Sequence, residues 1–165
     1  MPEKKTIERA GKDKREGKAA STQAGEFVKE QMDKIRTGKH GARNTKQAIA
    51  MGLSEARRAG VGLKPPAPGK TSEKTRKSAE SAYEKGQRHE PVSKTRSQAS
   101  EKALKKEPRS AASPQALSRQ TKSAAANRPA SERSNAAKKA SMTKGPTERS
   151  AAAKKAAKTR KMRQG

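Results

Sequence analysis

The chain has 165 residues, of which 42 are Lys or Arg and 16 are Asp or Glu, so its formal net charge is +26. Hydrophobic residues make up 28% of the chain, but 29 of them are Ala, which leaves only 17 side chains larger than a methyl group. These are too few for the core of a conventional enzyme of this length. High charge with little bulky apolar surface is typical of a polycation whose partner is a polyanion, most commonly nucleic acid.

The composition excludes several other classes. There is no Cys, so the chain has no disulfide framework, thiolate nucleophile or Cys-based zinc site. His40 and His89 lack companions at ligand spacing, and no Ser, His and Asp set indicates a catalytic triad. No apolar run is long enough to span a bilayer, and the first ten residues lack the apolar stretch of a secretory signal. We therefore expect a cytoplasmic, nucleoid-located protein that is not an enzyme, with no cofactor, metal, small-molecule substrate or membrane partner.

The predicted fold class is mostly α and largely disordered, with a short αα-hairpin head and a Lys/Ala-rich tail. Residues 1–20 mix Lys, Arg, Glu and Gly around an isolated Ile7. Such a segment cannot bury apolar surface, so the sequence predicts a disordered basic lead-in.

Residues 21–63 form the predicted hairpin head. Apolar residues recur there at helical spacing, which predicts one helix over 22–37 and a second over 45–59. Asn44 is a suitable N-cap for the second helix, and Gly60 a suitable end. Nine larger apolar residues are concentrated in this region: Phe27, Val28, Met32, Ile35, Ile49, Met51, Leu53, Val61 and Leu63.

A hairpin of about 40 residues has a marginal core on its own. We therefore expect it to be stabilised by forming a homodimer through residues 21–63 or by binding a partner. Three alternatives remain for its second helix. It could be a DNA-reading helix carrying Lys46, Arg57 and Arg58 in a helix-turn-helix arrangement, a helix that only packs against the first, or part of a protein-docking surface.

Residues 64–70 form a predicted Pro-rich linker, at which we place a domain boundary. Residues 71–165 are a basic tail rich in Ala, Lys and Ser, where short helices are expected to be marginal and separate because bulky side chains are scarce. We expect them to gain order when phosphate neutralises their charge. The predicted N-caps of these helices are Ser72, Ser93, Ser113, Ser131 and Thr147.

The charge pattern of the tail is the main functional signal. If residues 147–163 are helical, Lys154, Lys158 and Lys161 form a cationic stripe that matches a phosphate backbone. The alternative is a solvated tail with no partner. The candidate nucleic-acid-binding residues are Lys46, Arg57, Arg58, Arg119, Lys122, Lys138, Lys139, Lys154, Lys155, Lys158, Arg160 and Lys161.

The head resembles a family of small basic bacterial proteins of unknown function, through STQAGEFV at residues 21–28 and GKHGARNTKQAIAMGLSEARRAGV at residues 38–61. Members look like a short head joined to a Lys/Arg/Ala tail, and some are loosely labelled as DNA-binding or plasmid-stabilisation proteins. The tail, with its Ala-Ala-Lys-Lys-Ala repeats, is similar in composition to bacterial proteins that resemble linker histones. Neither resemblance implies particular site residues.

Together these features predict a non-enzymatic protein that binds DNA, or RNA, through phosphate contacts and largely without sequence preference. It would be a nucleoid-associated protein similar to a linker histone. The alternative is a protein-interaction or stress-associated protein whose head docks a protein partner and whose tail associates with RNA or ribosomes.

Overall fold

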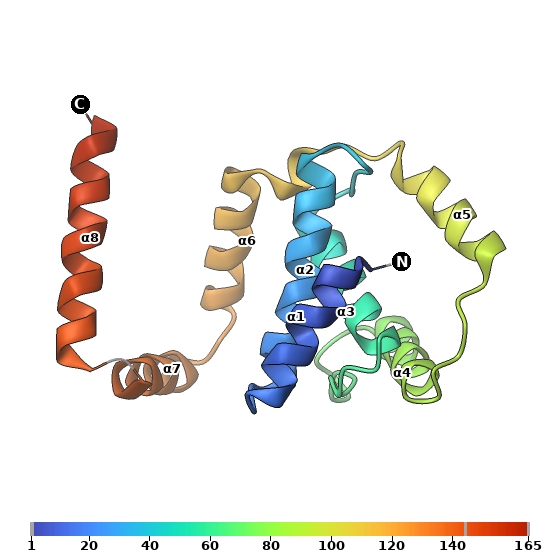
Figure 1. The fold of residues 1–165 in the computed structure, drawn as a ribbon, viewed down its shortest axis with the longest axis horizontal. Helices are drawn as coiled ribbons and strands as arrows, with labels where there is room; N and C mark the ends of the chain where they lie inside the picture. Colours follow the sequence, from blue (N-terminus) through green and yellow to red (C-terminus); the bar gives the residue numbers. More distant parts are fainter. Residues whose placement is uncertain (1, 144, 165) are drawn as a thin grey trace. The chain divides into compact units, whose positions relative to one another are not determined.

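The computed structural model describes residues 2–143 and 145–164, and these residues form helices and loops with no strand among them (Figure 1). The prediction of a mostly α chain is confirmed, and the prediction that the chain is largely disordered is wrong. The chain divides into two compact units, an N-terminal unit that ends at Gln120 and a C-terminal unit that begins at Thr121. The elements are α1 (Lys4–Arg15), α2 (Ala20–Arg36), α3 (Thr45–Arg58), α4 (Glu73–Gln87), α5 (Lys94–Leu104), the 3-10 helix η1 (Ser110–Ala112), α6 (Pro114–Ala126), α7 (Ala130–Thr143) and α8 (Pro146–Gln164).

Helices α2 and α3 form the predicted hairpin and pack against each other. The Asn44 side chain caps α3 by accepting a hydrogen bond from the Gln47 N–H at 2.9 Å. At the other end, Gly60 adopts a φ of +84°, and the Val61 N–H donates to the Ala56 carbonyl at 3.1 Å. This is the Schellman arrangement that a Gly after the last turn favours, so both predicted ends of α3 are confirmed.

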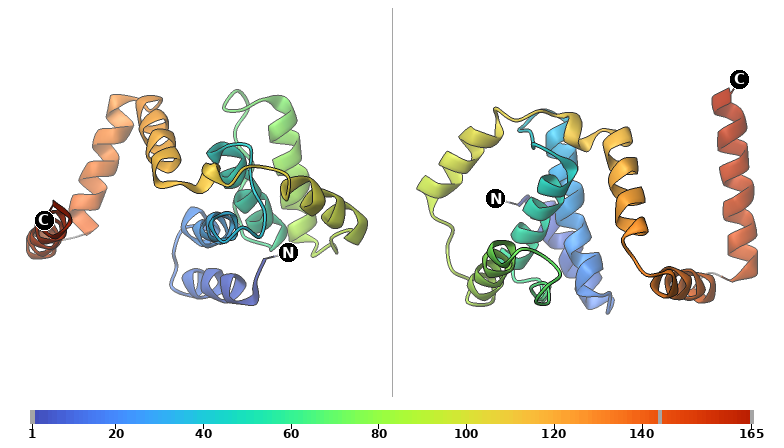
Figure 2. Two further views of the ribbon diagram at one scale, coloured as in Figure 1. Left: turned by 90° about the horizontal axis from the view of Figure 1, so that it is seen from above. Right: turned by 180° about the vertical axis from the view of Figure 1, so that it is seen from behind.

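The basic lead-in is folded, contrary to our expectation. It contains α1, which packs on the side of α2 away from α3, so that α1, α2 and α3 lie in that order (Figure 2). Helix α1 buries Thr6, Ala10 and Asp13 at helical spacing. A face made of small and polar residues carries almost no apolar signal, which is why the sequence pattern missed it.

The hairpin is also covered by residues of the expected tail. Helix α4 packs on α3, and η1 packs on both α2 and α3. These contacts bury Ala79, Ala82 and Gly86 of α4 and Ala111 and Ala112 of η1. The cover that we assigned to a second copy or partner is therefore provided by the same chain. The N-terminal unit includes the expected linker, and residues 64–70 do not separate the hairpin from α4.

Alanine forms most of the core of this unit. Among the described residues, nine of the 13 buried hydrophobic side chains are Ala, and only Phe27, Met32, Ile35 and Val61 are larger. The chain thus forms a larger core than its few bulky side chains alone could provide. One buried cluster consists of Met32, Ile35, Ala42, Ala48, Ala111 and Ala112. The second consists of Ala10, Ala24, Phe27, Ala56 and Val61.

The C-terminal unit has no comparable core in the part that the structure describes. The described side chains of α7 and α8 are exposed, except for that of Ser141, which is half-buried. Helix α7 begins one residue before Ser131, and α8 one residue before Thr147, so these two predicted caps lie inside their helices. Among the helices described here, none combines the length and apolar character needed to cross a bilayer.

Candidate nucleic-acid interface

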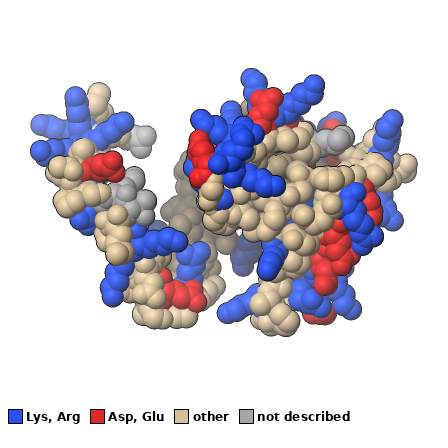
Figure 3. Space-filling view, turned by 60° about the horizontal axis from the view of Figure 1, so that its bottom comes forward, with Lys and Arg blue, Asp and Glu red and all other residues tan. Residues whose placement is uncertain are grey.

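Positive charge is densest in the C-terminal unit. From Thr121 onward there are 13 Lys or Arg and two Asp or Glu, a net +11 in 45 residues, against +15 in the first 120 residues. On the face shown in Figure 3, acidic side chains border many of the basic ones over the N-terminal unit, whereas basic ones predominate over the C-terminal unit at left. The two units therefore present different surfaces to a polyanion.

Helix α8 carries the predicted cationic stripe. Lys154, Lys158 and Lys161 are exposed and share one face, because they recur at intervals of four and three residues in a continuous helix. Lys155 and Arg160 flank this stripe on either side. The one carboxylate of α8, Glu148, is in the first turn and away from the stripe.

Four further predicted residues lie on α6 and α7. Lys138 and Lys139 are exposed on α7, which has a single carboxylate in its first turn. Arg119 and Lys122 are exposed on α6, three residues apart. All four could reach phosphate without a rearrangement of buried groups.

The three candidate residues on α3 do not form a joint surface. Lys46 is exposed in the first turn and Arg58 in the last turn. Arg57 is only 7% exposed. Its Nε donates to the Leu63 carbonyl at 3.1 Å and its Nη2 to the Lys64 carbonyl at 3.4 Å. Arg57 therefore holds the chain that follows α3, and our prediction that it contacts nucleic acid is not supported by its position.

Ion pairs engage most of the acidic side chains of the N-terminal unit. Lys18 binds Asp13 at 2.7 Å and Glu16 at 2.8 Å. The hydrogen bonds that Lys18 donates to the carboxylates of Asp13 and Glu16 raise its pKa above the ordinary value. Similar pairs recur on α2, α4 and α5. Because this unit has +15 in 120 residues against +11 in the 45 of the C-terminal unit, its outward field per residue is weaker.

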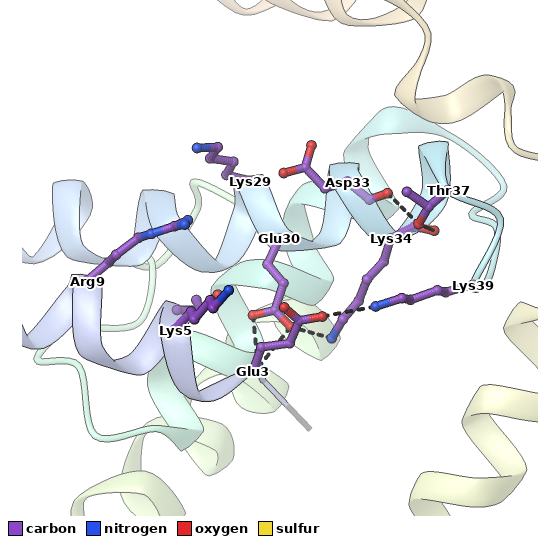
Figure 4. Close-up of a pocket in the computed structure, with 10 residues that line it drawn as sticks. Glu3, Lys5, Arg9, Lys29, Glu30, Asp33, Lys34, Thr37 and Lys39 are labelled. Carbon is purple, nitrogen blue, oxygen red and sulfur yellow. Dashed lines mark hydrogen bonds and ion pairs between the residues drawn. The ribbon is translucent and has the colours of Figure 1, made fainter.

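A basic pocket of about 240 Å³ between α1 and α2 was not predicted (Figure 4). We expected no site here because residues 1–20, which form one side of the pocket, were predicted to be disordered. It is lined by Glu3, Lys5, Thr6, Arg9, Lys29, Glu30, Asp33, Lys34, Thr37 and Lys39.

Glu30 is the centre of this pocket. The Glu3 N–H donates to both Glu30 carboxylate oxygens, at 3.0 and 3.2 Å, and Lys34 forms an ion pair with the same group. Burial disfavours the ionised form of Glu30, but the hydrogen bonds from Lys34, Thr6 and Glu3 outweigh it and lower its pKa below the ordinary 4.5. The Glu30 carboxylate thus binds the N–H of Glu3, which directly precedes α1, and this contact ties the start of α1 to α2.

Comparisons with models of protein families, with curated proteins and with solved structures found no match. Within residues 2–143 and 145–164, no group of three or more His, Asp or Glu side chains is placed to hold a metal ion. The placement and pairing of the charged side chains are therefore the features of this chain that point to a function.

Proposed function

We propose that this chain is a non-enzymatic nucleic-acid-binding protein that contacts DNA phosphates through its C-terminal unit, with little sequence preference, as a nucleoid-associated protein does. The observation that supports the proposal is the stripe of Lys154, Lys158 and Lys161 on α8. These three ammonium groups are exposed on one helical face, with no carboxylate of α8 beside them. A regular row of cations of this kind is suited to a regular row of phosphates.

The energy of such binding comes from counterion release. Each phosphate that a Lys neutralises frees condensed cations, so the logarithm of the affinity falls with the logarithm of the salt concentration by about 0.9 per contact on duplex DNA. Lys acts as a point charge, and the Ala side chains between the lysines of α8 have no group that could read a base edge. We therefore expect affinity with little discrimination between sequences.

The N-terminal unit has a separate role in this proposal. Its two buried clusters and its ion pairs make it a folded body to which the cationic helices are attached. The head's resemblance to small basic bacterial proteins, some labelled DNA-binding, is in keeping with this arrangement.

A salt titration of the full-length protein tests the proposal. A labelled duplex of about 20 base pairs is titrated at several salt concentrations from about 50 mM upward, and binding is followed by fluorescence anisotropy. The triple variant Lys154→Gln, Lys158→Gln, Lys161→Gln should bind more weakly and show a shallower salt slope, by about 0.9 for each phosphate that the variant no longer neutralises.

The matched control removes the same charge from the N-terminal unit. Lys94, Lys102 and Lys106 are exposed there and form no ion pair among the described residues, so their replacement by Gln leaves the stripe intact. The control should keep a slope close to that of the unmodified protein. Absence of binding at about 50 mM salt, or equal slopes for the two triple variants, would rule out the proposed interface.

A further inference from the structure

A groove of about 490 Å³ runs between α3 and α4 in the N-terminal unit. Its apolar walls include Ile49 and Leu53 of α3, Ala79 of α4 and Pro66 of the connection between these helices. Ile49 and Leu53 are only partly buried, although each also packs against one of the two core clusters. The groove thus exposes apolar surface that is continuous with the core.

The lining of this groove includes three cations, Lys46, Arg57 and Lys74, and no carboxylate. Among the described residues, Lys46 and Lys74 form no ion pair. The nearby acids of α4 are engaged elsewhere, because Arg76 binds Glu73 at 2.7 Å and Glu80 at 3.4 Å. The groove therefore presents cations that no carboxylate of its lining neutralises.

Arg57 adds a second, independent observation. The residue is more than nine-tenths buried, and the hydrogen bonds described for its guanidinium go only to the neutral carbonyls of Leu63 and Lys64. A buried cation without a carboxylate is costly unless a counterion approaches. The groove thus combines apolar walls, exposed cations at Lys46 and Lys74, and a buried charge that a carboxylate would compensate.

We propose that this groove docks a segment of a partner protein that presents a bulky apolar side chain flanked by carboxylates. The apolar side chain would lie against Ile49 and Leu53, and the carboxylates would pair with Lys46 and Lys74. Nucleic acid suits the groove less well, because a phosphate backbone gains nothing from apolar walls. This proposal is independent of the DNA-binding role proposed for the C-terminal unit.

The test uses the full-length protein and a labelled helical peptide of about 12 residues, with Leu on one face and Glu on the flanks. A second peptide replaces every Leu by Ser and keeps the charge. The Leu peptide should bind more tightly than the Ser peptide. Because any acidic peptide is attracted to a chain of charge +26, this comparison isolates the apolar contact.

Two variants locate the binding in the groove. Ala50→Phe places a large side chain at an exposed groove position without changing charge, and Ala99→Phe makes the same change at an exposed position of α5. Lys46→Gln with Lys74→Gln removes the two exposed cations, and Lys94→Gln with Lys102→Gln is the charge-matched control. Each groove variant should lower the affinity for the Leu peptide by about tenfold, and each control should lower it by less than about twofold.

Three outcomes would overturn the proposal. The first is equal weakening by groove and control variants, which would mean that the peptide binds elsewhere. The second is equal affinity for the Leu and Ser peptides, which would mean attraction by charge alone. The third is a comparable loss of duplex DNA binding on Ala50→Phe, which would make the groove a nucleic-acid surface. Failure of the full-length protein to bind DNA at all would overturn only the role of the C-terminal unit.

Discussion

Gly52 of α3 lies directly against the backbone of Val28 of α2, so that a Cβ at residue 52 would lie 2.6 Å from the Val28 Cα. No side chain can be added there without moving one helix away from the other. The distance between the two helices of the hairpin is therefore set by the absence of a side chain at this one position.

Replacing Gly52 by Ala should destabilise the N-terminal unit by about 1 to 3 kcal/mol, because α2 and α3 must separate. The control is Gly25→Ala, in α2, where nothing lies within 4 Å of the added Cβ. That change should stabilise the protein by about 0.5 to 1 kcal/mol, because Ala favours the helix over Gly. Urea unfolding of both variants measures the difference, and a Gly52→Ala variant as stable as Gly25→Ala would contradict the packing described here.

Glu30 should make the stability of the protein depend on pH. Its pKa is lower in the folded chain than the ordinary 4.5, so its contribution is fully present above pH 4.5 and is lost as the pH falls through the lowered value. Glu30→Gln removes the charge that Lys34 and the Glu3 N–H bind, and should cost about 1 to 3 kcal/mol at neutral pH.

Thermal unfolding of the unmodified protein and of Glu30→Gln as a function of pH measures this effect. The two midpoints should converge as the pH falls below 4.5. If the difference between the two midpoints stays constant down to the lowest pH at which both proteins fold, Glu30 is excluded as the group that titrates.

Thr45 links the hairpin to a segment more than 60 residues later. Its Oγ1 donates a buried hydrogen bond of 2.7 Å to the Ala111 carbonyl. Thr45→Val keeps the shape and leaves that carbonyl without its donor, which should cost about 1 to 3 kcal/mol. Thr37→Val, which removes an exposed bond within the end of α2, should cost much less. Equal unfolding free energies for the two variants would show that η1 does not stabilise α3.

The division after Gln120 can be tested by truncation. A chain that ends at Ala126 keeps the N-terminal unit and the whole of α6. It should unfold at nearly the same temperature as the full chain, since the described side chains of α7 and α8 bury almost nothing. It should also lose most of its affinity for duplex DNA and much of the salt dependence. A large drop in the unfolding temperature would mean that the C-terminal unit stabilises the rest.

The parts of the fold that could be predicted from sequence are those with a local signal. The apolar spacing of α2 and α3, the Asn44 cap and the Gly60 stop are properties of short segments, and each is confirmed. So are the caps at Ser72 and Ser93, whose side chains accept from the N–H three residues later. Local rules decide these features before any tertiary contact forms.

The parts that could not be predicted depend on contacts between distant segments. Nothing in the residues around Ala111 indicates that they meet Thr45. Nothing in the residues around Arg57 indicates that its side chain binds the Leu63 carbonyl instead of facing solvent. Alanine was also misleading, because it is an ordinary helix former in an exposed helix such as α8 and a core residue where two backbones come close.

The alanine-rich core also bears on how the N-terminal unit responds to temperature. A methyl group exposes little apolar surface when the chain unfolds, and the heat capacity change of unfolding grows with that surface. The heat capacity change on unfolding this unit should therefore be smaller than the usual value of about 12 to 15 cal/mol/K per residue. A small heat capacity change flattens the curve of stability against temperature. This unit would then lose little stability on cooling. A protein with a core of bulky apolar side chains loses more, because hydrophobic stabilisation weakens at low temperature.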